Sequence, residues 1–567
     1  MSQKLVDSLK SEFGDKIVII NNACGDESVS VPGDSLPAVL KYLKESESCE
    51  QLTDIIGVDY PEKTERFEVN YLLRSIANKS RINVKVAVEE GMDIPTVSDI
   101  YKSANWAERE VFDLYGVKFR NHPDLRRILC HHEFEGHALR KDYPIEQGQF
   151  LSAPEKLIDD IEYHGGAFRA DEVKGEENPF DLLNVNIGPS HPATHGALRI
   201  EVQLDGETIV KAKSEIGYLH RCFEKEAEDH TWSLVMPYTD RLNYVSAMLN
   251  NCIYASSVEK LLGVEVPQRA QVIRVIVSEL SRIIDHLVCI CANLVDIGAL
   301  TNYWYFYNIR EGIYYDIIEP LCGSRLTTNY ARIGGLSHDL FDGFEDAVEK
   351  HLQKMEVAIK EVTGLIARNR IFLDRTVDVG VLTTNEALSH GFTGPCLRAT
   401  GLDYDVRKHA PYSGYEDYKF DIPIGENGDT RDRIMVRMEE MYQSASIIRQ
   451  GIEKLTPGPI ALDNASISLP PKESVYGSIE GVMNQFKLII EGIKVPAGEA
   501  YGYGEGANGE LGFYCVSDGT GQPHRLKVRP PCFPIFSAFD EIIEGLMIAD
   551  AIAILGSINI IAGELDR

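Results

Sequence analysis

Two histidines four positions apart are the first residues in this sequence whose types and spacing could do chemistry. His191 and His195 lie in the stretch "NIGPSHPATHGALR". On a helix this spacing would place both imidazoles on one face, where they could hold zinc. Pro192 and Gly196 disfavour a helix here, however, and no glutamate completes an H-E-x-x-H motif. A zinc site is therefore the least favoured of three interpretations; the others are a catalytic pair and residues that shape a loop.

A β-hairpin is predicted directly after these histidines. Apolar residues occupy every second position, a two-residue turn follows, and a second alternating run returns: Leu198, Ile200, Val202 and Leu204, then Asp205 and Gly206, then Thr208, Val210 and Ala212. Both histidines are therefore expected on the loop that leads into the first strand of the hairpin.

A long helix in the centre of a bundle is predicted over residues 268–295, which are apolar nearly all round. Ionisable residues interrupt it: Arg274, Glu279, Arg282, Asp285, His286 and, at its end, Asp296. Burying such charges costs several kcal/mol unless they are paired. Two interpretations are open: the charges pair with one another, as Glu279 would with Arg282, or they form a network that handles protons.

The fold class predicted for the whole chain is α+β, with more than one domain, because 567 residues exceed the size at which one core stops growing. Residues 1–145 are predicted to form a small α/β domain, and residues 146–180 have the composition of a linker. Residues 181–567 are expected to hold the hairpin, a helix bundle and a tail of strands and turns. Helical spacing gives the first domain an apolar helix face at Leu36, Val39, Leu40 and Leu43. It gives the second domain another from Thr430 onward, at Ile434, Met438, Met441, Ala445, Ile448, Ile452 and Leu455.

Composition excludes several classes of partner. A net charge of −30 argues against nucleic acid and against free-standing binding to anionic lipid. No stretch reaches the roughly 20 apolar residues of a spanning helix, and the N-terminus has no apolar signal core. The chain is therefore expected in the cytoplasm, with membrane contact only through partners. The 11 cysteines include no C-x-x-C pair, so no iron-sulfur cluster or zinc ion of its own is expected.

At this point the motifs carry a specific resemblance. "NIGPSHPATHGALR", "EIGYLHRCFEK", "PYTDRLNYVSAM", "ARIGG", "GLDYDVRK" and "GELDR" resemble the 49-kDa, or D, subunit of respiratory complex I, the proton-pumping NADH:quinone oxidoreductase. "WAEREVFDLYGVKFRNHPDLRRILC" and "GHALRKDYPI" resemble its 30-kDa, or C, subunit. One chain with both is similar to the fused C/D subunit of some bacteria, and the predicted linker lies where the two would join.

The resemblance extends to the large subunit of nickel-iron hydrogenases, which bind metal through two C-x-x-C pairs. The matching positions here are Asn243, Ser246, Ile561 and Glu564. Because none is a thiolate, a soft nickel site is not expected. The second domain is thus expected to have a hydrogenase-like fold in which the former metal pocket binds a quinone headgroup, ubiquinone or menaquinone.

The resemblance assigns roles to four residues. His195 and Tyr244 are implied to hydrogen-bond the two quinone carbonyls, and Asp296 to hold His195. Donors aimed at those oxygens stabilise the developing charge and can deliver protons. Arg221 is implied to lie beside the terminal tetranuclear iron-sulfur cluster of the neighbouring B subunit, where a cation favours the reduced cluster. His191 is then expected only to shape the loop.

One position departs from the family. Many relatives have a histidine just before the "Y-x-R-x-G-G" motif, whereas this chain has Thr327 at the matching place in "RLTTNYARIGG". Threonine cannot titrate. We therefore expect a cluster potential that is lower and only weakly dependent on pH, which would suit a low-potential quinone such as menaquinone.

The implied partners are the B subunit, the I subunit and the H and A subunits in the membrane, with FMN and the iron-sulfur clusters in partner subunits. The implied location is the cytoplasmic face of the bacterial inner membrane, and the first domain is expected to be a docking module. Two alternatives are a subunit of a related oxidoreductase that uses ferredoxin or reduced F420, and a scaffold whose pocket is vestigial. A nickel hydrogenase is the third, and the missing cysteines oppose it.

Overall fold

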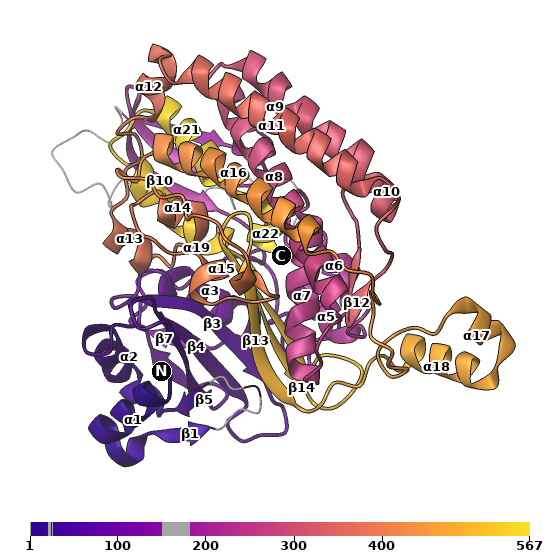
Figure 1. The fold of residues 1–567 in the computed structure, drawn as a ribbon. Coiled ribbons are helices and arrows are strands. Elements are labelled where there is room, and N and C mark those ends of the chain that lie inside the picture. The colour runs from indigo at the N-terminus through magenta and orange to yellow at the C-terminus, as the bar shows by residue number, and fades with distance from the viewer. Residues whose placement is uncertain (1, 21–23, 25–26, 150–181) are drawn as a thin grey trace.

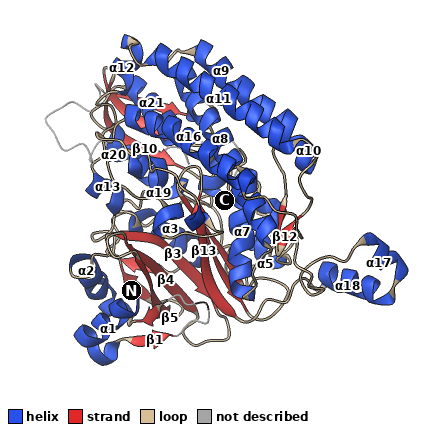
Figure 2. Cartoon of the chain, viewed as in Figure 1, coloured by secondary structure: helices blue, strands red, loops and turns tan. Residues whose placement is uncertain are grey.

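The structure is a computed structural model in which residues 2–20, 24, 27–149 and 182–567 are described. Most of the predicted linker therefore lies outside the described residues. Figure 2 shows most strands in the lower part of the molecule, a smaller group beside β10 at the upper left, and most helices in the upper part, the α+β class that the sequence predicts. The described residues up to 149 lie beneath the larger helical part (Figure 1).

The N-terminal part is a five-stranded sheet with helices beside it. The strand order is β1 (Val18–Ile20), β2 (Ser28–Ser30), β5 (Ser80–Val88), β4 (Phe67–Ser75) and β3 (Gln51–Asp59). Its helices are α1 (Ser2–Phe13), α2 (Leu36–Glu45) and α3 (Ala104–Tyr115), and β6 (Asp93–Pro95) pairs with β7 (Lys118–Arg120). Helix α2 buries Leu36, Val39, Leu40 and Leu43, which confirms the predicted face.

The predicted hairpin is present, with two differences. Strands β9 (Arg199–Asp205) and β10 (Thr208–Glu215) pair antiparallel across the turn at Gly206. A bulge between Ile209 and Lys211 shifts the register, so Ile209 is buried and Val210 is exposed. A third strand, β8 (Leu183–Ile187), joins the edge of β9 and was not anticipated, because its run "LNVNI" is short and contains two asparagines, which are unfavourable in strands.

Helix α8 (Gln268–Asp296) occupies the centre of the helical part, as its apolar sequence predicts. It contacts α7 (Ala247–Leu262), α9 (Leu300–Ile313), α16 (Thr430–Glu453) and α21 (Ile548–Ile558). Helix α16 buries Ile434, Met438, Met441, Ala445 and Ile448, and it ends before Leu455. The remaining helices of this region are α5 (Phe223–Asp229), α6 (Met236–Thr239), α10 (Glu319–Cys322), α11 (Phe344–Ile366), α12 (Arg370–Thr376), α13 (Thr384–Ser389), α14 (Gly394–Arg398) and α15 (Val406–His409).

The C-terminal segment, from residue 498 to the end of the chain, agrees only in part with the prediction of strands and turns. Strands β13 (Gly498–Glu505), β14 (Glu510–Ser517) and β15 (Arg525–Arg529) form an antiparallel sheet from the glycine-rich stretch, as expected. After them the chain is helical, in α19 (Cys532–Ser537), α20 (Phe539–Ile543), α21 and α22 (Ala562–Asp566), and the expectation of strands and turns is wrong there. Helices α17 (Lys472–Gly477) and α18 (Ile479–Ile490) project from the body (Figure 1).

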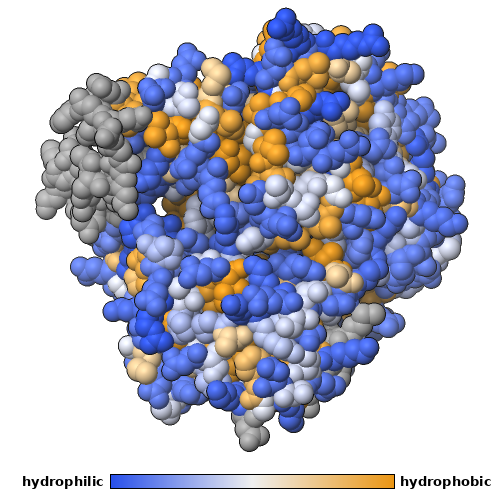
Figure 3. Space-filling model, turned by 90° about the vertical axis from the view of Figure 1, so that its left-hand side faces the viewer, coloured by the Kyte–Doolittle hydropathy of each residue, from blue (hydrophilic) through white to orange (hydrophobic). Residues whose placement is uncertain are grey.

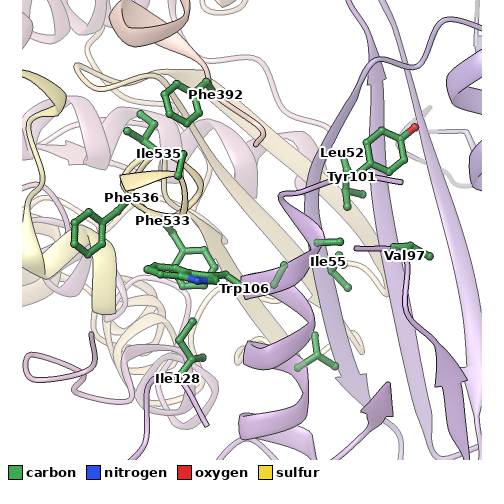
Figure 4. Packing of buried hydrophobic residues seen from close by; sticks show 14 of the residues in the cluster. Leu52, Ile55, Val97, Tyr101, Trp106, Ile128, Phe392, Phe533, Ile535 and Phe536 are labelled. Atoms are coloured by element: carbon green, nitrogen blue, oxygen red, sulfur yellow. The ribbon is translucent and has the colours of Figure 1, made fainter. Parts of the chain in front are cut away.

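The two parts of the chain share one hydrophobic cluster. Trp106 of α3 packs edge-on against Phe533 and Phe536 of α19, with ring centroids 5.4 and 5.9 Å apart (Figure 4). Buried ion pairs join the same parts, among them Arg74 with Glu510. The N-terminal part is therefore packed as part of the core of the second.

The outer surface is largely hydrophilic on the face that Figure 3 presents, with hydrophobic residues in separate patches between polar ones. Among the described helices, none combines the length and the apolar character that a membrane crossing requires.

The shared core predicts the effect of Trp106→Ala. Trp106 is buried, so the substitution leaves a cavity between the two parts and is expected to lower the free energy of unfolding by about 3–5 kcal/mol. Urea denaturation of the purified chain, followed by circular dichroism, measures this change. The matched control is Trp304→Ala, at an exposed tryptophan on α9, for which a change below about 1 kcal/mol is expected. Equal losses in both variants would contradict a core that joins the two parts.

Candidate functional site

The loop between β8 and β9 carries both histidines of the opening motif. A short 3₁₀ helix, Pro192–Thr194, ends at His195, whose φ of 55° lies in the left-handed region. The Thr194 hydroxyl donates to the His191 carbonyl at 2.7 Å, and His191 Nδ1 accepts the Ala193 N–H at 3.2 Å. His191 is exposed and its contacts stay within the loop, so its role in the structure is to shape the turn that presents His195.

The structure brings His195 and Asp296 together. His195 Nε2 lies 2.7 Å from Asp296 Oδ2, and their side chains are 20% and 14% exposed. Asp296 is the last residue of α8, where the partial negative charge of the helix C-terminus disfavours a carboxylate. An imidazole that can donate a proton or carry positive charge offsets that cost. The pair is therefore a polar contact at the surface end of a buried helix.

Tyr244 lies on the turn before α7, with 41% of its surface exposed. Partial burial raises the pKa of its phenol, and the nearby Asp285 and Cys532 raise it further. A phenol in this setting keeps its proton unless a strongly basic acceptor approaches. It can therefore donate to an oxygen that gains negative charge.

Helix α22 holds the His195 loop and the Tyr244 turn next to each other. A Cβ on Gly196 would lie 2.8 Å from the Ala562 Cβ, and a Cβ on Gly563 would lie 2.6 Å from the Arg241 carbonyl oxygen. Both glycines therefore permit approaches that a side chain would block. The two segments lie against consecutive residues of one short helix.

The positions that correspond to hydrogenase cysteines are buried. Asn243 Nδ2 donates to Asp285 at 2.7 Å, and Glu564 accepts the Cys532 N–H at 3.3 Å. Within the described part of the chain, no three histidine, cysteine, aspartate or glutamate side chains are grouped so that they could hold a metal ion. The side chains that could act as ligands at these positions are therefore amides and carboxyls.

Arg221 and Arg241 form a positive patch beside the Tyr244 turn. Both are exposed, and Arg221 Nη2 donates to the Arg241 carbonyl at 3.1 Å. Partial burial and then the charge of Arg241 lower the pKa of Arg221. Across residues 2–149 and 182–567, as far as these are described, neither arginine forms an ion pair with a carboxylate. Thr327 is exposed, and two residues further on the Asn329 N–H donates to Asp240, the residue before Arg241, at 3.1 Å.

The ionisable residues of α8 find most of their partners on other elements. Arg274 pairs with Glu259 at 2.7 Å and His286 contacts Glu440 at 3.2 Å. The one pair within the helix that the sequence suggests, Glu279 with Arg282, is present at 3.2 Å. Asp285 instead accepts from two asparagine side chains.

A buried cluster of charges surrounds Glu279 and Arg282, and its members on other elements were missed in the sequence. Its further members are Arg398, Asp405, Arg407, Glu440 and Glu505, from α14, α15, α16, β13 and the loop before α15. Burial opposes the ionisation of Asp405, but Arg407 and Arg398 outweigh it and lower the pKa of this carboxyl to about 2. The same balance lowers the pKa of Glu440. The charged residues on the apolar helix α8, and Glu440 on the apolar side of α16, are the signals in the sequence that point to the cluster.

Comparison with known proteins identifies the family. Family models for the 30-kDa and 49-kDa subunits of respiratory-chain NADH dehydrogenase match residues 29–149 and 296–567. The chain is 46% identical over 568 residues to the C/D subunit of NADH-quinone oxidoreductase from Bdellovibrio bacteriovorus, covering 99% of this chain and 100% of the relative. The chain belongs to the family of fused C/D subunits of NADH-quinone oxidoreductase.

Two further relatives show how the fusion is composed. The C/D 2 subunit from Aquifex aeolicus is 38% identical over 589 residues, 99% of each chain. The separate D subunit from Myxococcus xanthus is 51% identical over 383 residues, 68% of this chain and 92% of the relative. The predicted identity as a fused C/D subunit, a component of an oxidoreductase complex, is therefore confirmed.

The buried cluster predicts the effect of Arg407→Met. The substitution leaves Glu279, Asp405 and Glu440 short of positive charge and is expected to cost about 3–5 kcal/mol in the free energy of unfolding at neutral pH. The lowered pKa of Asp405 stabilises the fold above its ordinary value of 3.8, and this contribution is lost as the pH falls toward about 2. The deficit of the variant should therefore shrink toward low pH.

Urea denaturation at several pH values measures both effects. Arg370→Met is the matched control, because this arginine is exposed in a surface pair with Asp374 and should contribute less than about 1 kcal/mol. A variant at Arg407 that unfolds like the wild type at neutral pH would show that the cluster is not a stabilising unit.

Proposed function

We propose that His195 and Tyr244 bind the headgroup of a quinone and supply the protons for its reduction within the assembled NADH-quinone oxidoreductase. The observation that carries this proposal is their placement: the loop that carries His195, whose imidazole lies 2.7 Å from Asp296, and the turn that carries the half-exposed phenol both lie against the same short helix. The His195–Asp296 pair and Tyr244 both reach the surface, so a second subunit can complete the cavity around them.

The chemistry of a quinone suits these side chains. Two electrons convert its two carbonyl oxygens to a dianion that must take two protons. Because His195 Nε2 lies 2.7 Å from Asp296 Oδ2, we propose that Nδ1 is the ring nitrogen that donates to the substrate. Tyr244, whose pKa burial raises, gives up its proton only as charge develops on the facing oxygen. The two donors thus act on the reduced form of the substrate more strongly than on the oxidised form.

The positive patch supports electron entry from a partner. Arg221 and Arg241 bring two positive charges to the surface beside Tyr244. An iron-sulfur cluster ligated by thiolates is anionic, and nearby cations favour its reduced state. We propose that this surface faces the tetranuclear cluster of the B subunit, which passes electrons to the quinone. The I, H and A subunits, the cytoplasmic face of the bacterial inner membrane, and NADH oxidation at FMN in another subunit complete the proposed setting.

Tyr244→Phe tests the site, because it removes one hydroxyl and little else. We expect NADH:quinone activity in membranes to fall by about 100-fold while NADH:ferricyanide activity, which draws electrons upstream, is unchanged. Tyr476→Phe is the matched control, at an exposed tyrosine on α17, and should leave both activities as they are. If quinone reduction survives in Tyr244→Phe, the pocket is vestigial and the chain serves as a scaffold.

Thr327 predicts the behaviour of the partner cluster. Because threonine does not titrate, the midpoint potential of the cluster should be low and should change with pH by much less than about 60 mV per unit, the value for one proton per electron. A redox titration of the complex, followed by electron paramagnetic resonance at several pH values, measures this slope. Thr327→His should steepen it. A steep slope in the wild type would instead mean that another group couples protonation to cluster reduction.

A further inference from the structure

Two buried carboxyls behind Tyr244 are held differently from the acids of the charge cluster around Glu279. Asp285 of α8 and Glu564 of α22 are 1% and 2% exposed. Glu279, Asp405 and Glu440 are balanced by arginines within about 3 Å. In contrast, none of the ion pairs in the described portion of the chain includes Asp285 or Glu564. These two carboxyls are held by neutral groups.

A chain of amides joins the two acids. The Asn559 side-chain NH₂ donates both to Asp285 Oδ1 at 2.9 Å and to Asn508 Oδ1 at 2.6 Å. Asn508 Nδ2 in turn contacts Cys532 Sγ at 3.5 Å, and the Cys532 N–H donates to Glu564 at 3.3 Å. Amide donors stabilise a carboxylate less than a cation does. If both acids in this network were ionised, no positive charge paired with them would offset their mutual repulsion.

The pKa shifts of the two carboxyls agree with this geometry. Burial, and then the charge of Asp285, raise the pKa of Glu564 to about 7, and hydrogen bonds from Cys532 and Asn508 offset this only in part. Burial likewise raises the pKa of Asp285, against the opposing influence of His286, Asn243, Arg437 and Asn559. Both shifts favour the protonated form, and Glu564, with a pKa of about 7, is the carboxyl that gains or loses a proton near neutral pH.

The network also reaches the phenol of the proposed quinone site. Asn243, the residue before Tyr244, donates to Asp285 at 2.7 Å. Asp285 and Cys532 are the two neighbours whose charges contribute to the pKa of Tyr244. The backbone at Gly563, next to Glu564, lies against the carbonyls of residues 241 and 242. The acid pair is thus directly behind the turn that carries Tyr244.

We propose that Asp285 and Glu564 store a proton and return it to Tyr244 after each turnover. This inference rests on the proposed quinone site. When Tyr244 gives its proton to a reduced quinone oxygen, its O–H bond breaks and a phenolate remains. The stored proton then moves to the phenolate, restoring the O–H bond and leaving both acids ionised. Their mutual repulsion draws a proton back from solvent, which balances the cycle.

Glu564→Gln in the assembled complex tests the proposal, because Gln keeps the shape and the acceptor oxygen but cannot hold the proton. Tyr244 must then be reprotonated from solvent. We expect NADH:quinone activity to fall by about tenfold or more at about pH 8 and to return toward the wild-type rate at about pH 6, on either side of the Glu564 pKa of about 7. A larger kinetic isotope effect in D₂O should accompany the loss, with ferricyanide activity unchanged.

Glu108→Gln is the matched control, since Glu108 of α3 is a buried acid in the other part of the chain whose pKa burial raises to about 8. Its pH profile should match the wild type. Infrared titration of the complex is the second readout: the protonated-carboxyl band lost near pH 7 in the wild type should be missing in Glu564→Gln even if its activity is too low to profile.

The outcomes separate this inference from the proposed function. A Glu564→Gln complex with the wild-type pH profile and an unchanged infrared titration would overturn the proton store, while a defective Tyr244→Phe would leave the quinone site standing. A uniform loss at every pH, without a change in isotope effect, would assign Glu564 to structure alone and would equally overturn the proposal. Unchanged quinone reduction in Tyr244→Phe would remove the foundation of both.

Discussion

Ionised side chains inside a helix bundle are tolerated only where each has a partner, because the loss of hydration costs several kcal/mol. Helix α8 carries Glu279, Arg282, Asp285 and His286 through the middle of the molecule, all of them buried. Partners for these groups come from segments far along the chain: Arg407 from α15, Glu440 from α16 and Asn559 from the end of α21. The arrangement of these segments around α8 therefore follows from the need to satisfy its charges as much as from the burial of its apolar residues.

The same helix uses two different solutions about two turns apart. Around Glu279, arginines supply positive charge, the carboxyls stay ionised, and the result is a fixed lattice of ion pairs. Around Asp285, asparagines supply hydrogen bonds without charge, and burial raises the pKa of the carboxyl. The same helix thus fixes structure at one point and favours a protonated carboxyl at the next, and its last residue, Asp296, lies 2.7 Å from an imidazole. What distinguishes these roles is the chemistry of the partner rather than the residue on α8.

Elements with a strong repeating pattern could be predicted from the sequence, and elements defined by distant contacts could not. The apolar spacing of α2, α8 and α16 gives their extent to within a few residues. Strand β8 was missed although its sequence alternates, because the run is only five residues long and asparagine is unfavourable in strands, and the bulge at Val210 because one extra residue leaves the pattern almost intact. For the site, the individual residues could be named from motifs. The contact between His195 and Asp296 and the proximity of Glu564 to Asp285 depend on how α8 and α22 pack, and no local pattern encodes that.

Helix α22 connects the N-terminal part to the proposed quinone site, although none of the residues proposed for that site belongs to the N-terminal part. Ala562 lies against Gly196 of the histidine loop, and Gly563 against the turn that leads to Tyr244. Further along the same helix, Asp566 accepts the N–H groups of Gly217 and Leu219, which positions the loop before Arg221. The Arg567 side chain then pairs with Glu110 of α3, and Lys527 of β15 pairs with the same carboxyl. Because Glu110 belongs to the N-terminal part, that part anchors the helix against which the histidine, tyrosine and arginine segments all rest. Covalent fusion of the two parts keeps this anchor at a high local concentration, so the geometry of the proposed quinone site is coupled to the docking of the N-terminal part.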